Sequence, residues 1–72
     1  MSRYSLDPQR AAAVLAATGW TRRALSRKLD LHVEVVSRWI RARHTIPAYR
    51  LEQIAEIIGV PVDAFFGSGG AR

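Results

Sequence analysis

The sequence has no cysteine among its 72 residues. This absence excludes disulfides, thiolate metal sites and cysteine nucleophiles together. Long hydrophobic runs are missing as well, since the longest apolar stretch, residues 11–17, is too short and too rich in alanine for a membrane span or the core of a secretory signal. We therefore expect a soluble chain that stays in the cytoplasm and is not exported.

Patterns that carry catalysis or hold cofactors are also missing. Ser26 and Ser37 have no histidine and acid in a suitable arrangement, and no glycine-rich phosphate loop follows a strand pattern. His32 and His44 lie 12 residues apart without cysteine or paired carboxylates near them, which is not the pattern of a metal site. We expect neither an enzyme nor a protein with a cofactor, a metal or a small-molecule ligand.

Positive charge is concentrated in one part of the chain. Residues 21–44 contain seven arginine and lysine residues and two acidic ones, which accounts for the whole net charge of +5, because the remainder carries four of each. Such a segment attracts polyanions, of which nucleic acid is the first candidate and an anionic membrane surface the second. A charge run is also common on an ordinary solvated face, so charge alone does not decide the function.

The apolar spacing and the capping residues predict a small all-α fold. Asp7 and Pro8 begin a helix that covers residues 9–18 and ends before a glycine. The other predicted helical segments are residues 22–29, residues 33–42, a helix from Pro47 to residue 58, and a short turn over residues 62–66. Because no segment alternates like a strand, we expect a compact bundle of about five short helices. The expected domain covers residues 1–66, and a flexible tail follows at residues 67–72.

The helices over residues 22–29 and 33–42 are separated by about three residues, which is typical of a helix-turn-helix. This motif, at about residues 21–42, resembles the lambda repressor and Cro-type (XRE-like) helix-turn-helix family, and the resemblance continues to Phe66. The matching positions are Leu25, Leu29, Leu31, the run from Val36 to Trp39, the pair Ile46-Pro47 and the closing segment 58–66. The resemblance implies that the first helix of the motif crosses the DNA backbone and the second lies in the major groove.

The chain departs from the family pattern at four positions. Arg22 stands where a glutamine commonly meets a phosphate, and a guanidinium can do the same with a full charge. Ser26 replaces a small residue, usually alanine, and its hydroxyl can bond to its own helix. Asp30 stands where a glycine commonly takes the left-handed conformation. Aspartate tolerates this conformation less well than glycine, at a cost of about 1 kcal/mol. His32 replaces a serine or threonine cap and predicts a weaker start for the next helix.

The resemblance and the helical geometry assign candidate contact residues. Those that match base-reading positions, or lie beside them on the outward face, are Val33, Glu34, Ser37 and Arg38, with Val35 as an addition. The candidates for phosphate contacts, at the ends of the two helices, are Arg22, Arg23, Arg41 and Arg43. The candidates for a contact between two copies of the chain are Val62, Phe65 and Phe66. Trp20 and Trp39, with apolar neighbours at helical spacing, are expected to pack in the core.

Together these features predict sequence-specific binding of double-stranded DNA by a small transcriptional regulator of the Cro or repressor kind. We expect helix 33–42 to read the major groove of an operator, with a weak homodimer forming on the DNA and no membrane partner. The arginine and alanine content suggests a bacterium or its phage as the source, with the protein associated with the nucleoid. The alternative is a protein-interaction module, such as an antitoxin or a small adaptor, whose main partner is another protein.

Overall fold

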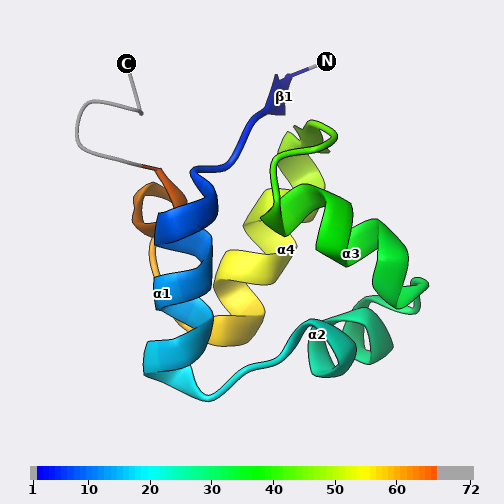
Figure 1. The fold of residues 1–72 in the computed structure, drawn as a ribbon, viewed down its shortest axis with the longest axis vertical. Helices are drawn as coiled ribbons and strands as arrows, with labels where there is room; N and C mark the ends of the chain where they lie inside the picture. The colour runs from blue at the N-terminus through cyan, green and yellow to red at the C-terminus, as the bar shows by residue number, and fades with distance from the viewer. Residues whose placement is uncertain (1, 67–72) are drawn as a thin grey trace.

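A computed structural model describes residues 2–66, and the predicted tail at residues 67–72 lies outside the described residues. Four α-helices and one 3-10 helix form most of the described part, together with a short strand pair (Figure 1). In chain order the elements are β1 (Arg3–Tyr4), α1 (Pro8–Thr18), α2 (Arg22–Leu29), α3 (Val33–Ile40), β2 (Ile46–Pro47), α4 (Ala48–Ile58) and η1 (Val62–Phe65). The prediction of a mostly helical bundle is confirmed.

The first three helices begin at side-chain caps. Asp7 accepts hydrogen bonds from two backbone N–H groups of the first turn of α1, and Thr21 accepts one from Ala24 in α2. Asp7 stands where the sequence predicts a cap, and Thr21 directly precedes the predicted helix 22–29. His32 stands at the cap of α3, where the sequence analysis expects a weaker cap, and its ring Nδ1 accepts a hydrogen bond from the Glu34 N–H at 3.1 Å. The neutral imidazole therefore takes the part of a serine or threonine oxygen.

Each α-helix ends at a residue that has a positive φ and lies in or just after the last turn. Gly19 and Gly59 close α1 and α4, and Asp30 closes α2 at φ 57°, as predicted from the family resemblance. The end of α3 differs from the prediction, because the helix stops at Ile40 rather than at Ala42. Ala42 has a φ of 58°, its N–H donates to the Trp39 carbonyl, and the Arg43 N–H donates to the Arg38 carbonyl. These two bonds form a Schellman motif, which ends the helix two residues early.

Replacing Ala42 by glycine should raise the free energy of unfolding. The left-handed conformation costs an L-residue about 1–2 kcal/mol, and glycine does not have this cost. The unfolded chain is more flexible with glycine, which offsets about 0.4–1 kcal/mol of the gain. The net stabilisation should therefore be about 0.5–1 kcal/mol. Thermal unfolding should show a midpoint about 2–8 °C higher. Ala13→Gly, on the exposed side of α1, is the matched control and should destabilise by about 1 kcal/mol. An Ala42→Gly midpoint below that of the wild type would contradict the assigned conformation.

The core lies where the helices meet. Its largest fully enclosed side chains come from five elements and are Leu25, Val36, Ile40, Ile46, Leu51, Ile54 and Phe65. Trp39 is buried and Trp20 packs half-buried against the same cluster, so the prediction that both are core residues is confirmed. The buried Ser26 hydroxyl donates to the Arg23 carbonyl at 2.7 Å, as predicted, so its burial leaves no unpaired polar group.

A two-stranded sheet corrects the expectation that the chain has no strand. β1 pairs with β2 in antiparallel fashion, with Arg3 opposite Pro47 and Tyr4 opposite Ile46. Two residues per strand are too few to produce a visible alternation in the sequence. Pro47 belongs to this pair and is the N-cap of α4, so that helix starts one residue later than predicted, at Ala48. The pair lies at the end of the bundle where α4 begins (Figure 1).

In residues 2–66, no helix has the length and apolar character needed to cross a membrane.

Candidate nucleic-acid interface

α3 presents two different faces. Val36, Trp39 and Ile40 are buried against the core. On the outward side Glu34 and Arg38 are exposed, while Val33 and Ser37 are half-buried. The division between inward and outward residues therefore follows the spacing read from the sequence, because positions three and four apart share one side of a helix.

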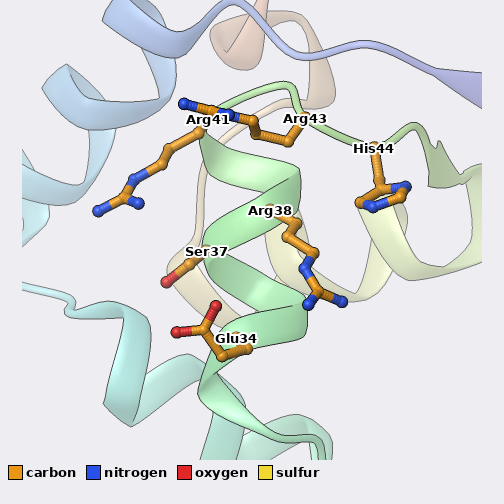
Figure 2. A pocket seen from close by; sticks show the side chains of 6 residues that line it. All are labelled: Glu34, Ser37, Arg38, Arg41, Arg43 and His44. Atoms are coloured by element: carbon orange, nitrogen blue, oxygen red, sulfur yellow. The ribbon is translucent and has the colours of Figure 1, made fainter.

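The outward side of α3 continues into the loop that follows it. Together they line an open hollow of about 420 Å³, whose residues are Glu34, Ser37, Arg38, Arg41, Arg43 and His44 (Figure 2). The hollow brings three candidate base-reading residues together with two candidate phosphate-binding arginines. In Figure 2, Glu34 and Ser37 project from one side of α3, one turn apart, and Arg38 projects from the other side.

His44 belongs to this surface, and sequence reasoning missed it. It is exposed and follows directly after Arg43 in the loop between α3 and β2. Its backbone N–H points to the Arg38 carbonyl at 3.4 Å, and the Arg43 N–H donates to the same carbonyl at 2.8 Å. The only signal in the sequence is its place next to Arg41 and Arg43, just after α3.

The hollow carries more positive than negative charge. Arg38, Arg41 and Arg43 are opposed by the single carboxylate of Glu34, and none of the three guanidinium groups forms an ion pair with another described side chain. All three arginines are exposed, so their donors are free to meet an external anion. Planar guanidinium groups form paired hydrogen bonds with phosphates and with guanine edges.

Arg22, Arg23 and Val33 lie outside this hollow. Arg22 is the first residue of α2 and is half-buried, with an enclosed Nε that has no hydrogen-bond partner among residues 2–66. Arg23 is exposed beside it, and Val33 is the first residue of α3. The two arginines thus stand at the N-terminal end of α2, where the helix dipole favours an anion.

Val35 and Arg38 border a second, smaller hollow of about 190 Å³ on the other side of α3. Its remaining lining residues are Arg3, Trp39, His44 and Thr45. Val35 is half-buried and packs against the core. Arg38 therefore lies between two hollows, and the smaller one extends the surface around α3 to strand β1.

Of the three residues expected at a contact between copies, Phe65 needs correction. Its side chain is 0% exposed, so it belongs to the core and presents nothing to a partner. Val62 and Phe66 are half-buried, and the Phe66 ring packs edge-on against Tyr4 at a centroid distance of 5.8 Å. Two adjacent aromatics on a short helix cannot both face inward, and here Phe65 takes the inward position.

The fold and this surface define a helix-turn-helix protein: two short helices separated by a three-residue turn, with a cationic outward face on the second and in the loop behind it. A helix-turn-helix family model matches residues 12–65, and the chain belongs to this family, which confirms the XRE-like resemblance. Comparisons with curated proteins and with solved structures gave no match. Membership indicates a DNA-binding transcription regulator, a class that is generally not enzymatic.

Proposed function

We propose that this protein binds double-stranded DNA sequence-specifically with α3 in the major groove, as a small Cro-like or repressor-like regulator that occludes a promoter or operator. The observation that carries the proposal is the joint presence of Glu34, Ser37 and Arg38 with two loop arginines in one open hollow. A B-DNA major groove, about 12 Å wide, admits one α-helix and exposes the base edges that such side chains read. The DNA-binding domain covers residues 1–66 in this proposal.

Phosphate contacts flank the recognition helix in this arrangement. Arg22 and Arg23 stand at the start of α2, and Arg41 and Arg43 stand in the loop after α3. Contacts on both sides of the groove fix the register of the helix without reading sequence. The exposure of the three arginines other than Arg22 supports this role.

Base contacts come from the outward side of α3. Arg38 can bind guanine O6 and N7 with two hydrogen bonds, Glu34 can accept from cytosine N4, and Val33 can pack on a thymine methyl. The Ser37 hydroxyl can donate or accept. No asparagine or glutamine occurs in α3, so two-bond reading of adenine is not available from this helix. We therefore propose a half-site specified by guanine, cytosine and thymine methyl groups.

Two copies bind one operator in this proposal. One recognition helix of eight residues contacts only a few base pairs, whereas selectivity over a genome needs two half-sites about one DNA turn apart. The half-buried Val62 and Phe66 support a small contact between the copies. Such a contact is too small to hold a dimer without DNA at low concentration.

Selection of sites from random duplex DNA, followed by salt titration on the selected sequence, tests the function. A phosphate-binding interface gives an affinity that falls steeply with salt, by a slope of about 0.9 for each phosphate neutralised. A flat salt response, or failure to enrich any sequence, would count against DNA binding and favour the protein-interaction alternative.

Single alanine replacements of Arg23, Arg41 or Arg43 should weaken binding to selected and random DNA equally. Each should also lower the salt slope by about 0.9, because one phosphate contact is lost. The matched control is Arg10→Ala, which removes one charge from the exposed surface of α1 and should leave the slope unchanged. If a variant instead changes the preferred sequence and keeps the wild-type salt slope, that arginine contacts the bases and not the phosphates.

A further inference from the structure

Strand β1 is attached to the loop that carries the cationic residues. The Arg3 guanidinium donates from Nε to the Thr45 hydroxyl at 2.7 Å and from Nη2 to the Thr45 carbonyl at 2.6 Å. The two residues are 42 positions apart in the sequence. Two donors of one planar group on two acceptors of one residue fix both the distance and the direction of the contact.

The same strand also completes the start of α4. The Ala48 N–H, at the first residue of that helix, donates to the Ser2 carbonyl at 3.0 Å. Pro47 is the N-cap and supplies no side-chain bond, so this carbonyl satisfies one of the helix's free amides. With the β1–β2 pairing, residues 2–4 hold the whole end of the loop.

The loop from Arg41 to Thr45 is therefore held at two places. Its beginning is fixed by the bonds from the Arg43 and His44 amides to the Arg38 carbonyl. Its end is fixed by Arg3 on Thr45. Between these places Arg43 and His44 line the larger hollow beside α3, and Arg3 itself lines the smaller hollow with Arg38 and His44.

We propose that Arg3 is a positioning residue for DNA binding: through Thr45 it holds the loop so that Arg43 and His44 stay beside Arg38. This inference rests on the proposed function, since the loop matters only if it contacts DNA. The Arg3 guanidinium bonds to Thr45 within the protein. DNA binding therefore depends on the geometry of this contact and not on the charge of Arg3. A direct bond from Arg3 to a DNA phosphate is the competing explanation.

Two replacements separate these explanations. Arg3→Lys keeps the charge but cannot form the two-donor contact, whereas Arg3→Ala removes both. If Arg3 positions the loop, both variants should bind the selected DNA about 3- to 10-fold more weakly, the loss expected for the net contribution of one ordinary hydrogen bond. Arg10→Ala, which removes an equal charge from α1, should bind like the wild type. An Arg3→Lys variant with wild-type affinity would overturn the proposal in favour of a charge effect.

A double-mutant cycle with Arg43 tests whether Arg3 acts through the loop. In an Arg43→Ala background, the further change Arg3→Ala should cost much less than in the wild type, because the contact that Arg3 positions is already gone. Independent phosphate contacts would instead give additive losses. Additivity would overturn the proposal even if each single replacement weakened binding.

Amide hydrogen exchange in the free protein provides a readout that needs no DNA. Arg3→Ala should accelerate exchange at His44 and Ala48 several-fold, while Gly19, at the far end of α1, should exchange at its wild-type rate. Unchanged exchange at both positions would overturn the proposal. If exchange is accelerated but the wild-type protein selects no DNA, Arg3 still supports the loop. The proposed function is then wrong, and the structural role of Arg3 stands.

Discussion

Phe65→Ala is expected to lower the free energy of unfolding by about 3–5 kcal/mol, the range for deleting a fully buried aromatic ring. Phe65 is the largest fully enclosed side chain among residues 2–66 and joins η1 to the core. A domain of this size has a total stability of only about 5 kcal/mol, so the variant should be largely unfolded at 37 °C. Urea denaturation followed by helical circular dichroism measures the loss. Wild-type stability in this variant would contradict the placement of Phe65 in the core.

Phe66 is the matched control for this result. It is half-buried and contacts the exposed Tyr4 edge-on, so Phe66→Ala should cost clearly less than the Phe65 change. The same position tests the proposed contact between copies. Phe66→Glu should reduce cooperative occupancy of a two-site operator while binding to a single half-site is retained. A complex mass that shows one chain per operator would defeat the two-copy arrangement.

Arg38→Ala is expected to cost about 1–3 kcal/mol of discrimination at a guanine in each half-site, a loss of about 5- to 160-fold in preference. Arg38 is exposed at the centre of the outward side of α3 and borders both hollows. Competition between the selected sequence and versions with the guanine replaced measures the effect. Arg41→Ala is the control, and it should weaken binding without changing the preference. An unchanged preference in Arg38→Ala would show that the guanine is read elsewhere.

Glu34→Ala is the counterpart of this change, with an effect of opposite sign on random DNA. An exposed carboxylate in a cationic hollow repels phosphates, so its presence lowers non-specific affinity and is explained if it reads a cytosine or rejects other bases. The variant should bind random DNA more tightly and relax selectivity at one position. If neither the affinity for random DNA nor the selectivity changes, Glu34 does not contact the DNA. The proposed register of α3 in the major groove is then wrong.

The starts of α1 and α2 could be predicted because their signals are local. Asp7 and Thr21 are strong caps that need only their own helix. The end of α3 could not be predicted, since alanine gives no sign that it will take a positive φ, as Ala42 does. The β1–β2 pair was missed because it joins residues more than 40 positions apart, and two residues per strand leave no periodicity.

The candidate interface also contains residues that the sequence predicts and residues that it does not. The outward residues of α3 follow from apolar spacing alone, because one face of a short helix must pack on the core. His44 and Arg3 could not be identified, because their place beside Arg38 depends on the loop path and on the tertiary contact with Thr45. For the two phenylalanines the sequence indicates that one faces inward, but only the packing of η1 decides that it is Phe65.

The bond from the Asp7 N–H to the Phe65 carbonyl, 3.0 Å long, joins the N-terminal end of α1 to the C-terminal end of η1, and these two helices pack against each other. Protein synthesis delivers these ends at different times. A nascent chain exposes α1 and the helix pair α2–α3 while the ring that completes their shared core has not yet been made. A chain terminated before residue 65 therefore lacks the side chain that completes this core, and α3 is stably supported only once residue 65 has been added.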